Sequence, residues 1–197
     1  MLKKYLSYIF RGMFAGIMIG IGGVVFLSLD NKIFGATFFS IGLLVICMFD
    51  MYLYTGKIGY VISNKLSYVI LLIFTLIGNF IGTYLVAFAT LNSRINNIGE
   101  KARILSDIKL NDSVISILIL SIFCGILMYI AVNSYKTSKD IFGRYIPIFM
   151  CVIVFILCGF EHCIANMSTF SIGYMLLGDI GTASVIKSMI MVTIGNM

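Results

Sequence analysis

The sequence has little charge for its length. Only 11% of its 197 residues are Asp, Glu, Lys or Arg, whereas a soluble domain is about one quarter charged. With 60% hydrophobic residues and a mean hydropathy of +1.08, this shortage excludes an ordinary soluble domain. The apolar runs are also continuous and lack the alternation of membrane β-barrel strands. We therefore expect an all-α membrane protein, because helices satisfy their backbone hydrogen bonds within the bilayer.

The sequence also lacks the patterns that hold metals or redox centres. Its five cysteines lie in apolar runs without a C-x-x-C pair, and we interpret them as small packing residues. The only histidine, His162, has neighbours Glu161 and Cys163, but consecutive helical residues point about 100° apart and cannot converge on one ion. We expect no metal and no cofactor. An intramembrane enzyme using His162 as base and Cys163 as nucleophile is an alternative that the same geometry disfavours.

Six apolar segments reach or approach the roughly 20 residues needed to cross a bilayer. They cover about 12–29, 33–54, 68–89, 113–132, 145 to beyond 162, and 183–197. We interpret the first, a long glycine-rich run, as a membrane helix and not as a cleavable signal. The last has only about 15 residues, so we expect a sixth helix that is cut short.

The distribution of Lys and Arg favours an N-terminus on the cytoplasmic side. With that orientation, eight of the 14 basic residues lie inside and six outside. The inside set is Lys3, Lys4, Arg11, Lys57, Lys65, Lys136, Lys139 and Arg144. The net charge of +6 favours anionic lipid headgroups and anionic solutes as partners over nucleic acid. We expect a multi-pass protein of the cytoplasmic (inner) membrane.

Two of the expected helices are interrupted. Asp50 and residues 55–59 break the second, and polar residues at 166–171 follow His162 in the fifth. Broken helices at membrane depth are tolerated where they line a cavity or are buried in protein. An ionisable group at that depth usually marks a pathway for ions or protons. The histidine between interrupted segments therefore indicates a channel or transporter.

The two halves of the sequence correspond to each other. Ile-Gly-Asn occurs at 77–79 and again at 194–196, each time after a broken helix. Because each half has three helices, the second half must insert upside down, which is an inverted repeat. We expect one membrane domain, 1–197, with a first repeat at about 1–92 and a second at about 107–197.

Glycines recur at a spacing of four residues in two of these helices. Gly12, Gly16 and Gly20 share one face of the first, and Gly78 and Gly82 share one face of the third. Small residues at this spacing let helix backbones approach closely. The sequence leaves open whether they pack within a protomer or between protomers.

The segment FEHCIANM at 160–167 resembles the FEHSIANM motif in the fifth helix of the formate/nitrite transporter family. Similar matches at 53–56, 78–80, 125–127 and 194–196 extend the resemblance over the whole chain, most closely to the hydrosulfide channel branch. It implies an aquaporin-like six-helix protomer in a homopentamer with one pore per protomer. It also implies passage of small monovalent anions such as formate, nitrite or hydrosulfide, and no enzymatic activity.

The resemblance also assigns roles to individual positions. The implied pore residues are His162 at the centre, Thr55 on the loop, Lys109 before the fourth helix, Asn196 in the sixth helix, and Glu161. The implied hydrophobic constrictions are Phe39, Leu43 and Phe155 on one side and Leu53 and Tyr54 on the other. Glu161 acts either as a pore carboxylate or as a hydrogen-bond acceptor where the helix breaks. Tyr52 departs from the Glu that the family often has before this loop motif.

Two mechanisms remain open from the sequence. An unpaired anion in an apolar slot costs several kcal/mol or more, and Lys109 would lower this barrier by concentrating anions nearby. Because imidazole titrates near neutral pH, His162 would let the anion cross as its neutral acid. Alternatively, the protein is a passive channel in which His162 only donates a hydrogen bond. Thr55 or Asn196 is the expected partner that fixes the tautomer of the ring.

Overall fold

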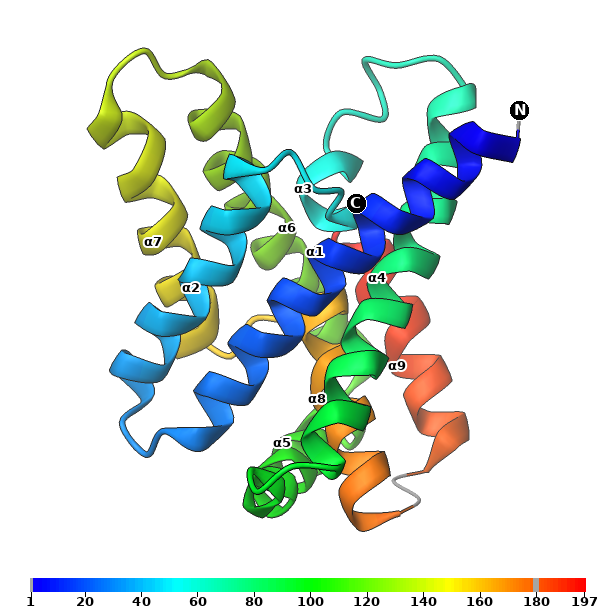
Figure 1. Ribbon diagram of the computed structural model, residues 1–197, viewed down its shortest axis with the longest axis vertical. Helices are drawn as coiled ribbons and strands as arrows, with labels where there is room; N and C mark the ends of the chain where they lie inside the picture. Colours follow the sequence, from blue (N-terminus) through cyan, green and yellow to red (C-terminus); the bar gives the residue numbers. More distant parts are fainter. Residues whose placement is uncertain (1, 179–180) are drawn as a thin grey trace.

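The computed structural model describes residues 2–178 and 181–197, and the regular elements in these ranges are helices (Figure 1). They are α1 (Leu2–Ser28), α2 (Lys32–Met48), α3 (Tyr54–Ile58), α4 (Ser67–Leu91), the 3-10 helix η1 (Asn96–Ile98), α5 (Gly99–Leu110), α6 (Val114–Thr137), α7 (Ile141–Leu157), α8 (Cys163–Leu177) and α9 (Thr182–Gly195). The helices α1, α4 and α6 are each long and apolar enough to cross a bilayer alone. The helices α2, α7, α8 and α9 are shorter apolar helices. The predicted all-α membrane fold is confirmed.

The first helix is longer than predicted. Apolarity alone placed its start near residue 12, but α1 begins at Leu2 and includes Lys3, Lys4 and Arg11. These side chains are half-buried or exposed, so their charged ends reach beyond the apolar part of the helix. A hydropathy profile detects the membrane-embedded part of a helix and misses such an extension.

The helix α5 was not predicted. It lies at the end of the molecule opposite the N-terminus (Figure 1), between the two halves of the chain. Its residues Ala102 and Ser106 are buried, and Ala102 packs in a small core with Ile98 and Ile172. Because α5 is polar on its outer face and short, it falls below the threshold that identifies a membrane span.

Both predicted breaks exist; the first contains Asp50 as predicted but ends before residues 55–59, and the second lies before the predicted stretch 166–171. The chain leaves α2 after Met48 and resumes as α3 at Tyr54, and it leaves α7 after Leu157 and resumes as α8 at Cys163. The polar stretches 55–59 and 166–171, predicted to be the interruptions, are largely helical. Asp50 and Gly159 adopt positive φ angles of 46° and 70° in the two breaks, and a left-handed residue ends an α-helix.

The spaced glycines pack α1 directly against α4 within one chain. A Cβ atom on Gly82 would collide with the backbone carbonyl oxygen of Met13, and one on Gly16 would collide with the backbone of Asn79. No larger side chain fits where the two backbones approach this closely. The question that the sequence left open is therefore answered for this pair of helices.

The course of the chain is the same in both halves. Figure 1 shows the N-terminus, the α3–α4 connection and the α6–α7 connection at one end, and the α1–α2 connection with α5 at the other. In each half a long helix is followed by a broken helix and then by a helix that carries Ile-Gly-Asn. The two broken helices run in opposite directions through the centre, as an inverted repeat requires.

Candidate functional site

The first break is held by Asn79 from the middle of α4. Its Oδ1 atom accepts a hydrogen bond of 2.9 Å from the backbone N–H of Tyr54, the first residue of α3. Its Nδ2 atom donates to the carbonyl oxygens of Tyr52 and Gly12, each at 2.8 Å. The amide is fully buried. One side chain therefore satisfies backbone groups that the broken helix leaves unpaired.

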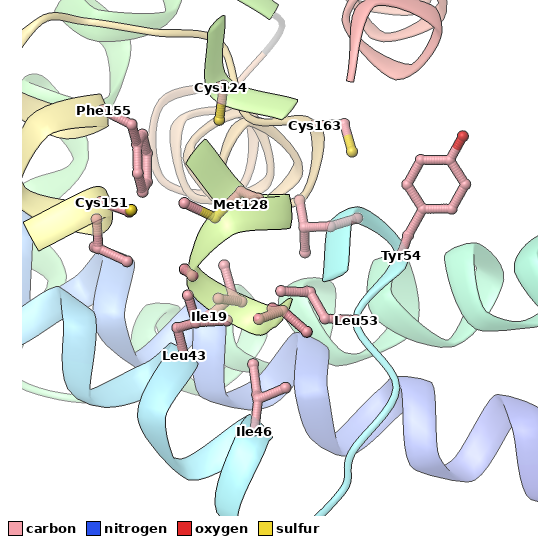
Figure 2. Close-up of a cluster of buried hydrophobic side chains, with 14 of the residues drawn as sticks. Ile19, Leu43, Ile46, Leu53, Tyr54, Cys124, Met128, Cys151, Phe155 and Cys163 are labelled. Carbon is pink, nitrogen blue, oxygen red and sulfur yellow. The ribbon is translucent and has the colours of Figure 1, made fainter. Parts of the chain in front are cut away.

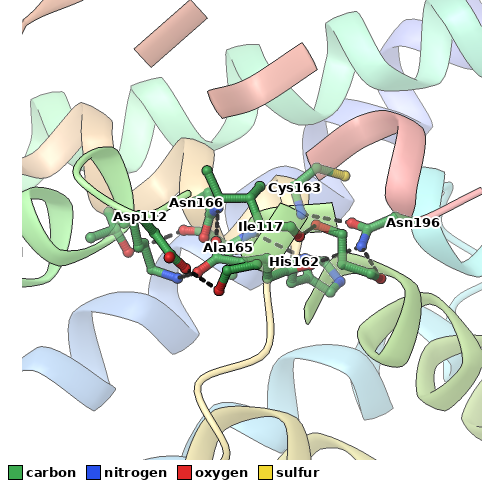
Figure 3. Close-up of polar contacts among 12 residues, drawn as sticks. Asp112, Ile117, His162, Cys163, Ala165, Asn166 and Asn196 are labelled. Carbon is green, nitrogen blue, oxygen red and sulfur yellow. Dashed lines mark hydrogen bonds and ion pairs between the residues drawn. The ribbon is translucent and has the colours of Figure 1, made fainter. Parts of the chain in front are cut away.

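Asn196 holds the second break with the same set of bonds. Its Oδ1 atom accepts from the backbone N–H of Cys163 at 2.9 Å, and its Nδ2 atom donates to the carbonyl oxygens of Glu161 and Ser121 at 2.8 Å each. Figure 3 shows this amide facing the start of α8. The repeated Ile-Gly-Asn motif is thus a pair of matching backbone clamps. Asn196, predicted as a partner for the imidazole, bonds the main chain instead.

His162 lies at the start of α8 and is almost completely buried, with 2% of its surface exposed. Its Nδ1 atom accepts a hydrogen bond of 3.1 Å from the backbone N–H of Ala165. Its Nε2 atom lies 2.9 Å from Thr55 Oγ1. Because Nδ1 accepts, the neutral ring carries its proton on Nε2, which donates to the Thr55 hydroxyl. The predicted contact with Thr55 therefore fixes the tautomer.

The half helices α3 and α8 begin on opposite sides of the Thr55–His162 contact. Tyr54 is the first residue of α3 and Cys163 is the first residue of α8, so both N-terminal ends point toward the centre. The N-terminus of a helix such as α8 carries a partial positive charge, although the N–H groups of Cys163 and Ala165 are paired with Asn196 and His162. The centre of the protein therefore favours negative charge.

Apolar side chains surround the histidine. The rings of Phe39 and Phe155 meet edge to face at 6.0 Å, and Phe155 stacks on the imidazole at 5.5 Å. Leu43 and Leu53 are buried in the same cluster. In Figure 2 the ring of Tyr54 points away from Leu43 and Leu53. The structure places Phe155 against the ring, and all five predicted constriction side chains belong to one buried cluster.

Lys109 and Glu161 form a buried ion pair. Lys109 Nζ at the end of α5 lies 2.7 Å from Glu161 Oε1, and their side chains are 16% and 5% exposed. The other carboxylate oxygen accepts a hydrogen bond from Asn166 Nδ2. Glu161 therefore accepts hydrogen bonds at the helix break, which was one of its two predicted roles. Lys109, expected to attract anions as a free charge, is largely neutralised by its partner.

Asn166 completes this network and was not among the predicted site residues. It is buried and lies one helical turn beyond His162, on α8. A polar amide in the first turn of an otherwise apolar helix is the sequence signal that points to it, since a buried amide needs partners.

The chain matches known proteins over its whole length. Residues 2–197 match the family model described as formate/nitrite transporter. The formate-nitrite transporter of Plasmodium malariae is 29% identical over 95% of this chain and 69% of that protein. The Plasmodium knowlesi protein of the same name is 28% identical over 87% of this chain, and the match covers 65% of the length of that Plasmodium protein. A probable formate transporter of Methanothermobacter thermautotrophicus is 34% identical over 37% of this chain and 27% of its own.

Two solved structures have the same fold. One is described as a pentameric formate channel with formate bound; it has a TM-score of 0.86, 24% identity, and coverage of 98% of this chain and 92% of its own. The other, an FNT family ion channel, has a TM-score of 0.82, 19% identity, and coverage of 97% and 84%. The helices, the two clamped breaks and the whole-length family match agree. This chain belongs to the formate/nitrite transporter family.

Proposed function

We propose that the protein conducts small monovalent anions along a path that passes His162 within each protomer. The observation that carries this proposal is the buried imidazole, whose Nε2 atom lies 2.9 Å from Thr55 Oγ1 between apolar side chains and two helix N-termini. Formate, nitrite and hydrosulfide are the anions we expect. The names of the relatives, formate-nitrite transporter and formate channel, support the first two.

The barrier on this path is the removal of water from the anion. Leu53 on one side of the ring, and Leu43 with Phe155 on the other, leave the anion few polar partners, at a cost of several kcal/mol or more. The anion takes up one proton beside the ring and crosses as its neutral acid. The proton is supplied by water on the entry side, so one proton and one anion move together. His162 relays this proton: Nδ1 releases the Ala165 N–H and takes up a proton from entry-side water while Nε2–H passes one through the Thr55 hydroxyl to the anion. The neutral acid then gives its proton up to water on the exit side.

The rival mechanism within the same site is a passive anion channel. In that case His162 only donates from Nε2, and the anion crosses without a proton. The Nε2–H donor and the α8 N-terminus would then have to stabilise the anion alone. A measurement of proton movement with anion flux separates the two mechanisms, because only the first moves them in equal amounts.

An intramembrane enzyme using His162 and Cys163 is disfavoured. Both ring nitrogens have other partners, the backbone N–H of Ala165 and the hydroxyl of Thr55. A general base must be within hydrogen-bond reach of the group it deprotonates. The relatives and structural neighbours are transporters and channels, which also favours transport.

We further propose a homopentamer in the cytoplasmic membrane with the N-terminus inside. The pentameric formate channel with the same fold and the excess of Lys and Arg at the end that holds the N-terminus support this arrangement. The matching clamps of Asn79 and Asn196 support two repeats at about 1–92 and 107–197. Cysteine-accessibility mapping and the mass of the assembly in detergent test these statements.

The decisive experiment measures anion flux into proteoliposomes. Formate, nitrite and hydrosulfide are compared between pH 5 and 8 while a dye inside the vesicles reports proton movement. We expect flux to rise as the pH falls, and a His162→Phe variant to lose that dependence. Cys163→Ser serves as the control and keeps full flux. Absence of flux above protein-free vesicles for all three anions would contradict the function, and an unchanged pH profile in His162→Phe would contradict proton coupling.

A further inference from the structure

A cavity of about 250 Å³ lies against Leu53, on the face of the constriction where α3 continues away from the histidine. Its wall comes from the ends of α2 and α6, from α3, and from the start of α7. These segments lie together at the end of the molecule that also holds the N-terminus (Figure 1). Three of the lining residues are cationic: Lys57, Lys136 and Arg144.

The three cations are held in place without a carboxylate partner. Lys57 Nζ lies over the ring of Tyr52, 3.8 Å from its centre, and Lys136 Nζ lies over the ring of Tyr60 at 4.2 Å. Arg144 Nε donates to the backbone carbonyl of Ser138 at 2.9 Å. Aromatic faces and carbonyl groups position a cation without pairing it with an opposite charge.

The one carboxylate in the wall is already paired. Asp50 lines the cavity, but its Oδ2 atom lies 2.9 Å from the guanidinium of Arg11 on α1. The ion pairs found in the described part of the chain do not involve Lys57, Lys136 or Arg144. The cavity therefore keeps a net positive charge at the apolar entrance to the path.

The two ends of the path differ at one matched position. Asn79 binds the carbonyl of Tyr52 as Asn196 binds that of Glu161, so Tyr52 is the counterpart of Glu161. Near α5, the Glu161 carboxylate neutralises Lys109. Near α3, the counterpart is an aromatic ring, which holds Lys57 and Arg11 without cancelling their charges.

We infer that this cavity binds an oxyanion of two or more charges, of the phosphate type, and that the bound anion blocks the path. An Arg and two Lys side chains are suited to phosphate oxygens, and attraction grows with the charge of the anion. Leu53 prevents passage, because desolvating a multiply charged anion costs far more than desolvating formate. Inhibition of transport by the bound oxyanion rests on the proposed function, whereas binding of the oxyanion in the cavity does not. The phosphate is either free in solution or part of a lipid headgroup.

The first test measures block of flux. Formate uptake into neutral phosphatidylcholine vesicles is recorded with rising inorganic phosphate on the α3 side, and choline chloride keeps the ionic strength constant. We expect phosphate to inhibit the wild type, and its inhibition constant to rise about tenfold or more in a Lys57→Gln Lys136→Gln double variant. The control is Lys139→Gln, an exposed lysine outside the cavity wall. Block no stronger than with chloride, or equal block in the double variant, would overturn the inference.

The second test does not require transport. Cys47 lines the same cavity, so its modification by an anionic thiosulfonate reagent reports access to the site. Peptide mass spectrometry then gives the rate of labelling of Cys47. Phosphate is expected to slow this rate severalfold in the wild type and not in the double variant. If phosphate protects Cys47 in a protein that transports no anion, the phosphate site is supported and the proposed transport function is contradicted. If anion flux is normal and phosphate does not protect Cys47, the phosphate site is contradicted.

A third arm separates the two sources of phosphate. The measurements are repeated in vesicles that contain phosphatidylglycerol. If the headgroup occupies the cavity, free phosphate inhibits and protects less in these vesicles, and the double variant removes the difference between the two lipids. If free phosphate is the ligand, its effect is the same in both. Either result supports a phosphate site, and the two results identify its ligand.

Discussion

Thr55 Oγ1 and His162 Nε2 lie 2.9 Å apart although 107 positions separate them in the sequence. The contact joins the first turn of α3 to the residue that precedes α8, and it is one of the contacts between the two halves of the chain. Both groups are almost completely buried, at 1% and 2% exposure. Loss of this contact therefore changes the histidine and the connection between the halves together.

Replacing Thr55 with Val is expected to weaken the fold and change transport. The Nε2–H group would lose its acceptor in a dry environment, which costs about 1–2 kcal/mol. Unfolding of the detergent-solubilised protein by heat or SDS measures that loss, and formate flux measures the functional effect. Thr55→Ser keeps the hydroxyl and is expected to retain most of both. Equal stability of Thr55→Val and wild type would show that the contact contributes nothing.

The two clamp residues are expected to respond alike to substitution by Asp. In Asn79→Asp and Asn196→Asp, a carboxylate replaces the donor that serves two carbonyl oxygens in each clamp. We expect a loss of about 2 kcal/mol or more in each unfolding experiment. The control is Asn92→Asp, because Asn92 is exposed and bonds only its own helix. A tolerated clamp variant would contradict the role of these amides.

Gly82→Ala is expected to separate α1 from α4. The added methyl group would meet the Met13 carbonyl oxygen, which belongs to a rigid helix backbone. Overpacking of this kind costs about 1–3 kcal/mol. Gly173→Ala in α8 is the matched control, since its Cβ would have only ordinary van der Waals neighbours, which lie in α5, and alanine favours a helix. Similar melting temperatures for the two variants would argue against close packing at Gly82.

We expect substitutions of Lys109 and Glu161 to have non-additive effects on the stability of the protein. Glu161→Gln leaves a largely buried ammonium without its counterion, at a cost of about 3 kcal/mol. The double variant Lys109→Met Glu161→Gln removes both charges and is expected to recover much of that loss. In flux measurements, Glu161→Gln alone should increase apparent anion affinity from the α5 side, because Lys109 then acts as an uncompensated charge. Additive effects on stability would mean that the pair is not coupled.

The sequence predicted those parts of the fold that depend on hydrophobic segments and on repeated motifs. Continuous apolar runs predicted the membrane helices, and the repeated Ile-Gly-Asn predicted two corresponding halves. Asp50 was correctly predicted to lie in the first break, but the polar stretches 55–59 and 166–171 were wrongly taken as interruptions. Residues 55–58 are helical, and the interruptions depend on Asp50 and Gly159. Backbone angles of this kind leave only a weak trace in a sequence.

The sequence indicated most residues of the candidate site, but it did not indicate which of them contact one another. His162 stood out as the only histidine in an apolar segment, and the resemblance to the family implied Thr55 and the apolar constriction residues. The bond from Lys109 to Glu161 joins α5 to the break before α8, and α5 itself was not predicted. The contacts of Asn196 were assigned to the wrong atoms, since a side chain can equally serve a ring or a backbone. Contacts that depend on the relative placement of distant helices require coordinates.

The bonds of Asn79 and Asn196 go only to main-chain atoms, in the broken segments and in α1 or α6. Apart from the left-handed residues Asp50 and Gly159, these clamps therefore do not require any particular side chain in the bends. Positions such as Tyr52 and Leu53 are free to diverge while the scaffold stays intact. Preference among substrates can thus evolve by single substitutions in these tips, without a compensating change elsewhere in the fold.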